Sequence, residues 1–269
     1  FMFNLKVFLK RNLKKTPFLY RFFDLLWHYS FFISGAICLK MKYPNLKIYG
    51  RKRGLFSKGF RSDYGQDAII NQFAKKLKKD LFFLDIGCNH PETISNSFYL
   101  EKTLGFHGIA IDAISTYENL FKKERPNTKF LNYLISDTDG EEKKFVHVES
   151  LNGWEDMLSA EISNIRKEDL NIPHRIETIK TKTINAILKE NNVNAFSILL
   201  LDIEGLEYKA LQGIDFSSTK PYIVLCENVK GNFGLGSKRI RDFMISNGYI
   251  YFARIWKTDD LFVLPQLLS

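Results

Sequence analysis

The sequence predicts an α/β domain with a mostly parallel sheet and helices on both faces. From about residue 61 onward, short apolar runs alternate with segments that carry apolar residues at helical spacing. Several of these runs are continuously apolar, which is typical of parallel strands buried on both faces. The last two runs follow each other without a helix between them, so the sheet is expected to end in an antiparallel edge. With 269 residues, 45% of them apolar, the chain can bury one large core.

The individual elements follow from local patterns. Ile69, Ile70, Phe73 and Leu77 recur at helical spacing, and Gly248 suits the C-cap of the last helix. We expect helices at about residues 67–79, 95–104, 117–124, 184–191, 207–212 and 237–247. We expect seven strands in the sheet, at about residues 81–86, 108–111, 130–135, 196–201, 222–226, 249–254 and 261–264.

Two segments do not fit this alternation. Residues 144–148 follow a turn at 137–140 and predict a short antiparallel excursion. Residues 149–175 are polar and suggest an irregular loop, and a loop of that length in a compact domain is often a functional lid.

Residues 1–60 form a separate region in composition. They hold 13 Lys and Arg and one acid, Asp24, for a net charge of +12, whereas residues 61–269 hold 26 basic and 29 acidic residues, for −3. We expect a helical, basic and aromatic arm of residues 1–60 in front of a domain of residues 61–269. Such asymmetry suggests an anionic partner, which can be a substrate phosphate, a membrane surface or a nucleic acid. A binding module driven by the arm is the alternative to an enzyme, and a solvated arm without a specific partner is an equal alternative to both.

The most informative motif is the segment from Leu81 to Pro91, with sequence LFFLDIGCNHP. A buried strand delivers Asp85 to its carboxyl end, and Gly87 permits a tight turn with room for a ligand. A dinucleotide site would need further glycines so that a pyrophosphate could approach the helix N-terminus. An acid at this point repels pyrophosphate and suits a cationic amino-acid ligand, which favours S-adenosylmethionine over NAD.

The other strands also end in polar residues. Asp112 ends the second strand, where an acid can accept hydrogen bonds from both hydroxyls of a ribose. Ser136 and Asp137 follow the third strand, where adenine contacts would fall, and Asp202 follows the fourth. Because parallel strands bring their carboxyl ends to one edge of the sheet, we expect these side chains to share a site.

These segments resemble the FkbM-type methyltransferase family. The resemblance covers about residues 61–230 and is most specific at residues 202–207, with sequence DIEGLE. It implies a class I methyltransferase domain of Rossmann-like fold, S-adenosylmethionine as cofactor, and methyl transfer to a hydroxyl oxygen, often of a sugar in a polysaccharide or glycolipid precursor. The sequence has Cys88 where the family usually has a smaller residue, and Asp112–Ala113 where it usually has Glu–Pro.

The resemblance and the strand ends together give a set of expected site residues. The expected cofactor contacts are Gln66, Asp85, Gly87, Cys88, Asn89, Asp112, Ala113, Ser136, Asp137 and Asp202. The expected acceptor contacts are Tyr64, His90, Asn96 and Trp154. An alcohol needs a general base before it can attack a methyl group, and the candidates are Glu204, Glu227 and Asp202. For Glu204, a helix N-terminal acid is an equally good interpretation, and for His90 a turn-capping role is.

Other functions leave specific signatures. Asp202 and Glu227 can share a divalent cation, but the sequence offers no third ligand at a diagnostic spacing, so we predict no metal site. Residues 137–139, with sequence DTD, match the metal motif of glycosyltransferases, but the following Gly140 favours a turn. The acidic balance of the main domain argues against a nucleic-acid partner. Residues 18–39 contain Arg21, Asp24 and His28 and are too charged to span a membrane, so we expect a cytoplasmic protein, with peripheral membrane contact through the arm as a hypothesis.

Overall fold

A computed structural model describes residues 59–62, 64–149, 155–229, 236–255 and 258–268. The chain divides into two compact units, Phe1–Ile48 and Tyr49–Ser269, and every described residue belongs to the second. The expected helical arm therefore lies outside the described residues, apart from its last two positions. Within the described ranges, no helix combines the length and the apolar character that crossing a membrane would need.

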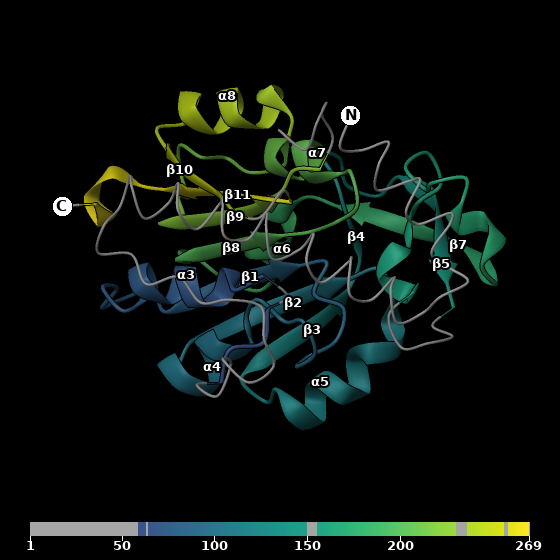
Figure 1. The fold of residues 1–269 in the computed structure, drawn as a ribbon, viewed down its shortest axis with the longest axis horizontal. Helices are drawn as coiled ribbons and strands as arrows, with labels where there is room; N and C mark the ends of the chain where they lie inside the picture. Colours follow the sequence, from purple (N-terminus) through teal and green to yellow (C-terminus); the bar gives the residue numbers. More distant parts are fainter. Residues whose placement is uncertain (1–58, 63, 150–154, 230–235, 256–257, 269) are drawn as a thin grey trace, which may run out of the picture. The chain divides into compact units, whose positions relative to one another are not determined.

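The second unit is built on a seven-stranded sheet (Figure 1). Its strands are β1 Phe82–Ile86, β2 His107–Asp112, β3 Thr128–Asn132, β8 Ile198–Leu201, β9 Ile223–Glu227, β10 Ile250–Ile255 and β11 Asp259–Val263. They lie in the order β10-β11-β9-β8-β1-β2-β3, and all pairings are parallel except those of β11 with β9 and β10. The sheet order reverses between β1 and β8, which is where open α/β sheets bind their ligands.

This sheet is the one that the sequence predicts, with one detail added. The antiparallel strand, β11, lies between β9 and the edge strand β10. The first residue of β11, Asp259, consequently stands opposite Glu227 at the carboxyl end of β9.

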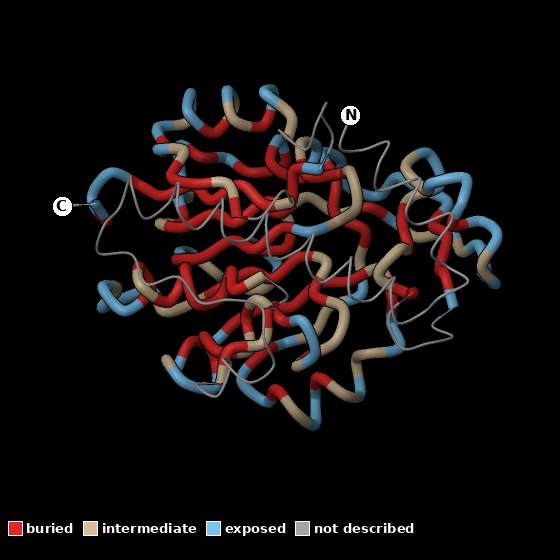
Figure 2. Tube along the Cα trace, in the orientation of Figure 1, coloured by how far each residue is buried: buried red, intermediate tan, exposed pale blue. Residues whose placement is uncertain are grey.

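Helices cover both faces of the sheet. Side chains along a strand alternate between the two faces, so apolar side chains are buried on both. They are α3 Gln66–Ala74, α4 Phe98–Leu104, α5 Glu118–Glu124, α6 Ile184–Glu190, α7 Glu207–Gln212 and α8 Lys238–Ser246. In β2, Ile109 and Ile111 belong to the main apolar core, which also contains buried side chains of α6, α7 and α8. Ala110 between them points the other way and joins Phe121 of α5. Figure 2 shows the resulting burial along the central strands.

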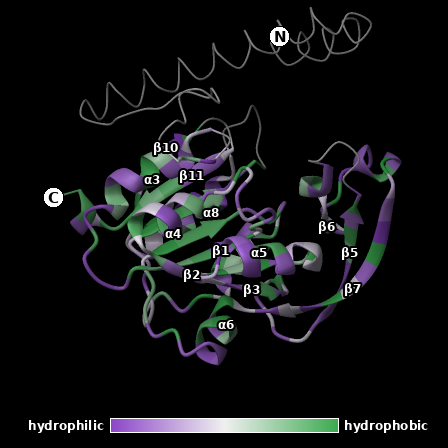
Figure 3. Cartoon of the chain, turned by 90° about the horizontal axis from the view of Figure 1, so that it is seen from below, coloured by the Kyte–Doolittle hydropathy of each residue, from purple (hydrophilic) through white to green (hydrophobic). Residues whose placement is uncertain are grey.

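A second sheet of four strands follows β3. It comprises β4 Leu134–Ile135, β5 Glu142–Val148, β6 Ala160–Glu161 and β7 His174–Lys182, in the order β4-β7-β5-β6. β5 and β7 run antiparallel side by side at one end of the unit (Figure 3). Short 3-10 turns complete the unit at Ser115–Tyr117, Glu155–Leu158, Asp169–Asn171 and Pro265–Leu267.

The second sheet corrects two expectations and contains one strand, β7, that the sequence does not predict. The expected strand at 130–135 is two strands, because β3 ends at Asn132 and β4 pairs with β7 instead of β2. The region 149–175 is not wholly irregular, since it contains β6 and the start of β7. β7 has no clear apolar alternation because most of its residues are exposed or half-buried on both faces, so the usual strand signal is missing.

Candidate active site

A cavity opens at the carboxyl ends of the central strands. The cavity has a volume of about 210 Å³. Its walls come from the ends of β1, β2, β8 and β9, from β4 and β5 of the second sheet, and from the turn at Glu155–Leu158. The polar side chains that line it are Asp85, Asn89, Thr93, Asn96, Asp112, Tyr133, Asp156, Ser159, Asp202, Glu204, Glu227 and Asp259.

The turn after β1 forms one wall. Gly87 has a φ of 78°, and its backbone N–H donates to the carbonyl of Ile111 over 2.8 Å. A Cβ atom at Gly87 would lie 1.6 Å from the carbonyl oxygen of Asp202. The tight turn is as the sequence predicts, but the immediate reason for glycine is the close packing of the turn against the end of β8. The two strand ends are thereby held together at the floor of the cavity.

A buried network fixes the carboxylate of Asp85. Its Oδ2 accepts a hydrogen bond of 2.5 Å from the hydroxyl of Ser97, which in turn accepts one of 3.1 Å from Arg125. Arg125 has no exposed surface and is paired with the equally buried Glu101. Burial raises the pKa of Asp85, while Ser97 and the charge of Arg125 lower it. Arg125 thus favours the charged form of Asp85, whereas burial favours the neutral form.

Asp112 ends β2 and organises the neighbouring backbone. Its Oδ2 accepts the N–H of Asn89 over 2.8 Å, and its Oδ1 accepts the N–H of Ile114 over 2.9 Å. Burial raises the pKa of Asp112 to about 6, against the lowering effect of these two bonds. Each carboxylate oxygen keeps a further lone pair that can accept from a ligand.

Asp156 is a functional candidate that sequence reasoning missed. It is buried, lines the cavity, and accepts hydrogen bonds from the hydroxyl of Tyr117 and, over 3.2 Å, from the side-chain amide of Asn89. Asp156 therefore connects the turn at Glu155–Leu158 to the two segments that follow β1 and β2. The sequence points to this region through the expected lid at 149–175 and through the expected acceptor contact Trp154 within it.

Two amide oxygens at the cavity stand out. Oδ1 of Asn89 and Oδ1 of Asn96 are buried and have no hydrogen-bond partner among the described residues. Buried polar atoms are normally paired, so each such atom calls for an explanation. Both residues line the cavity, and both oxygens can only accept. A ligand that donates hydrogen bonds would satisfy them.

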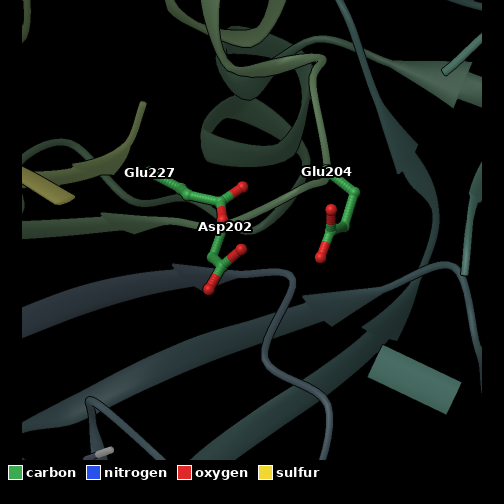
Figure 4. Close-up of side chains that lie close together, drawn as sticks. All are labelled: Asp202, Glu204 and Glu227. Carbon is green, nitrogen blue, oxygen red and sulfur yellow. The ribbon is translucent and has the colours of Figure 1, made fainter. Parts of the chain in front are cut away.

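Three carboxylates meet at the other side of the cavity, at the ends of β8 and β9. Asp202, Glu204 and Glu227 each place a carboxylate oxygen within 4.8 Å of the other two (Figure 4). Asp202 follows β8 directly, Glu204 lies in the next turn, and Glu227 ends β9. The structure brings together the three residues that the sequence proposes for catalysis.

Charge crowding dominates this cluster. Burial is the main cause that raises the pKa of Asp202 and of Glu227 well above the usual values. Neighbouring acids raise both further, chiefly Asp259 for Asp202 and Asp202 for Glu227. Asp202 remains open to the cavity, whereas only 8% of Glu227 is exposed. Oε2 of Glu227 is buried and has no hydrogen-bond partner among the described residues. A proton or a cation would relieve this repulsion.

The segment 202–207 divides its work between two glutamates. Oε1 of Glu207 accepts the backbone N–H groups of Ile203, over 3.2 Å, and of Gly205, over 2.9 Å. Glu207 therefore takes the turn-capping role at the start of α7. Glu204 lines the cavity and adopts a left-handed φ of 51°, which is costly for a residue other than glycine. A strained residue that faces a cavity supports a functional role for Glu204.

Asp259 and Gln66 complete this side. Asp259 lines the cavity, and its Oδ2 accepts hydrogen bonds from Gln66, over 3.0 Å, and from Thr258, over 2.7 Å. Gln66 itself is buried and does not line the cavity, and its Oε1 accepts the backbone N–H of Tyr64. The structure thus gives Gln66 a contact with a cavity acid, and its contact with a cofactor stays a prediction.

The remaining expected site residues fall into three groups. Gly87, Cys88 and Ala113 line the cavity, as the sequence suggests. His90, Ser136, Asp137 and Tyr64 do not line it. Nδ1 of His90 accepts the N–H groups of Glu92 and Thr93, which is the turn-capping alternative. Trp154 lies outside the described residues.

Ser136 and Asp137 miss the cavity because of the early end of β3. In their place, Tyr133, Leu134 and Ile135 line the wall next to β2. The polar residue at the end of β3 is Asn132, whose side-chain amide donates to the carbonyl oxygens of Asp112, over 2.9 Å, and Ala113, over 2.8 Å.

The comparison with known families agrees with this architecture. The chain has no significant match among curated proteins or among solved structures. The model of the methyltransferase FkbM domain matches residues 85–251, which is more than half of the chain and runs from the acid at the end of β1 into β10. The match includes the cavity floor, the second sheet and the three-carboxylate cluster. The chain therefore belongs to the FkbM methyltransferase family, as the sequence motifs suggest.

Proposed function

We propose that this methyltransferase uses S-adenosylmethionine and methylates a hydroxyl oxygen of a sugar-containing acceptor, such as a nucleotide-linked sugar or a precursor of a surface polysaccharide or glycolipid. The observation that carries the proposal is the division of the cavity into two acidic ends. Asp85 and Asp112 lie at the ends of β1 and β2, and the cluster of Asp202, Glu204 and Glu227 lies at the ends of β8 and β9. One end suits a cationic cofactor and the other a hydroxyl that must lose its proton.

The first end fits the cofactor. The oxygens of Asn89 and Asn96, unpartnered among the described residues, are acceptors in the same cavity as Asp85 and suit an ammonium donor, although the sequence assigns Asn96 to the methyl acceptor. Asp112 offers its remaining lone pairs to the two hydroxyls of a ribose. S-adenosylmethionine carries both groups, lacks phosphates that these acids would repel, and supplies a methyl group on a sulfonium.

The second end fits the acceptor. Burial and neighbouring acids raise the pKa of Glu227, which makes its ionised form a stronger base towards an alcohol, and Glu204 lies in the same cluster. Asp202 links the two ends, because it follows β8 beside Gly87. The walls of the cavity hold the acceptor oxygen, the methyl carbon and the sulfur in line and exclude bulk water.

The glycosyltransferase alternative loses its main support. Asp139 accepts hydrogen bonds from the backbone N–H of Thr183, over 2.7 Å, and from the hydroxyl of the same residue, over 3.3 Å. Asp137 accepts one from Ser136, and neither acid lines the cavity. The DTD segment therefore holds the turn before α6.

The proposal can be tested by methyl transfer from labelled S-adenosylmethionine to a panel of nucleotide-linked sugars, analysed by mass spectrometry. We expect one sugar class to gain a methyl group on oxygen. Glu204→Gln and Glu227→Gln should bind S-adenosylhomocysteine with nearly unchanged affinity but turn over at least about tenfold more slowly, since a general base contributes 10²–10⁴-fold. Normal turnover by both variants would remove their catalytic role, and transfer of a sugar instead of a methyl group would refute the proposal.

A further inference from the structure

The three-carboxylate cluster has a property that proton transfer alone does not explain. A general base needs one carboxylate, whereas three acids place oxygens within 4.8 Å of one another here. Only 8% of Glu227 is exposed, and its buried Oε2 has no hydrogen-bond partner among the described residues. Such an oxygen calls for an explanation, and binding of an ion is one that fits a cluster of acids.

Charge repulsion also favours a cation at the cluster. Three carboxylate oxygens within 4.8 Å of one another repel, and Glu204 interacts with Arg166, which is itself paired with Asp169 over 2.6 Å. A divalent cation would balance the charge that the three carboxylates carry together.

We propose that Asp202, Glu204 and Glu227 bind one divalent cation that prefers oxygen ligands, of the Mg²⁺ and Mn²⁺ class, and that this cation binds two neighbouring oxygens of the methyl acceptor. The second part rests on the proposed function, and the first part does not. The sequence alone identifies Asp202 and Glu227 as a pair, and the left-handed turn at Glu204 supplies the third ligand.

The donor set selects the kind of metal. Carboxylate oxygens are hard ligands that suit Mg²⁺, Ca²⁺ and Mn²⁺, whereas Zn²⁺ sites are built with histidine or cysteine. The cluster contains neither of these residues. Mg²⁺ takes six ligands in near-octahedral geometry, so three protein oxygens leave positions for water or for acceptor oxygens.

The open positions define the acceptor class. Two oxygens on adjacent carbons, as in a sugar diol, can bind one cation together and be oriented by it. The hydroxyl to be methylated passes its proton to a cluster carboxylate or to water, and its oxygen forms a bond to the methyl carbon. The bond between methyl and sulfur breaks, and its electron pair stays on sulfur. A bound cation lowers the pKa of that hydroxyl.

Titration of the full-length protein with Mn²⁺ tests the site directly. Electron paramagnetic resonance detects binding as a loss of the signal of the free ion. We expect one Mn²⁺ per chain, displaced by Mg²⁺. Asp202→Asn, Glu204→Gln and Glu227→Gln should each weaken Mn²⁺ binding by at least about tenfold, since even outer-shell changes cost 10–100-fold. Asp156→Asn, which removes a carboxylate from the same cavity outside the cluster, should change it by less than about threefold, because Asp156 offers no ligand to the cluster and is hydrogen-bonded to Asn89 and Tyr117. Thermal melts of each variant confirm folding.

The outcomes separate the two proposals. If the protein binds no Mn²⁺ that Mg²⁺ can displace, or if the cluster variants bind Mn²⁺ as tightly as the wild type, the cation site is refuted. A proton then remains as the species that relieves the repulsion between the carboxylates. Titration of S-adenosylhomocysteine in the presence of EDTA tests the cofactor site independently, and binding there without Mn²⁺ binding leaves the proposed function standing. We also expect EDTA to abolish methyl transfer and Mg²⁺ to restore it, and an acceptor lacking the neighbouring hydroxyl to lose affinity. An acceptor that reacts equally well without that hydroxyl would refute the two-oxygen contact.

Discussion

Asp112 is the residue at which the cofactor assignment can be tested most simply. Asp112→Ala removes an acceptor for two ribose hydroxyls, so the affinity for S-adenosylhomocysteine should fall by about 1–3 kcal/mol, or roughly 5- to 150-fold. Asp137→Ala is the control, because Asp137 is exposed and does not line the cavity. Isothermal titration calorimetry measures both. Unchanged affinity in Asp112→Ala would refute the assignment, and a loss in Asp137→Ala would restore the adenine contact that the sequence suggests.

The raised pKa of Asp112 predicts a pH dependence. Burial raises this pKa to about 6, so the carboxylate is charged above pH 6 and becomes protonated below it. Hydrogen bonds to the charged form are the stronger ones, and binding should weaken as the pH falls from 7.5 to 5, by up to about tenfold at pH 5. The same titration on Asp112→Ala should show a flatter profile. A wild-type affinity that stays constant over this range would contradict a ribose contact through the ionised form.

At the scale of single residues, the sequence predicts well those site residues that lie at the carboxyl ends of parallel strands. Asp85, Asp112, Asp202 and Glu227 each lie at or just beyond the end of a parallel strand, and the sheet brings them to one edge. Asp259 was not predicted because it begins a strand. It reaches the same edge because β11 runs antiparallel to β9. Asp156 and Arg125 reach the site through tertiary contacts that leave no periodic signal in the sequence.

Glu204 and Glu207 have different roles in the turn between β8 and α7. Glu207→Ala removes the acceptor of two backbone N–H groups, so the free energy of unfolding should fall by about 1–3 kcal/mol. Glu204→Gln should leave it unchanged or raise it, because one charge leaves a crowded cluster. Urea denaturation at pH 8 without divalent cations measures both values. Equal destabilisation by the two substitutions would contradict this division of roles.

Among the elements, the main sheet was predictable and the second sheet was not. Several strands of the main sheet are continuously apolar because helices cover both faces, and six of the seven lie close to the expected positions, whereas β3 ends early at Asn132. β4 is two residues long, and it continues the apolar run of β3, so the sequence gives no sign of the break at Tyr133. β7 is polar on both sides and is held by pairing with β5. Its strand character depends on that partner.

At the scale of the whole molecule, charge separates the arm from the domain. Residues 1–60 carry +12 and residues 61–269 carry −3. We propose that the arm holds the enzyme at an anionic membrane surface, since each basic residue near such a surface contributes about 1 kcal/mol. Full-length protein should sediment with vesicles containing anionic lipid at low salt, and should be released at high salt.

Vesicles without anionic lipid and protein lacking residues 1–60 are the controls for the arm. Both should remain in the supernatant. If full-length protein stays in the supernatant with anionic vesicles, the membrane proposal fails, and a role of the arm in gripping a substrate phosphate gains support.

The measurement that tests the central claim most directly is a crystal structure of the complex with S-adenosylhomocysteine. The account predicts that the ligand lies over Gly87, with its ribose hydroxyls on Asp112, its amino group within hydrogen-bond distance of the side-chain oxygens of Asn89 or Asn96, and its sulfur directed towards Asp202. Binding elsewhere on the chain, or no binding in the cavity at saturating ligand, would contradict it.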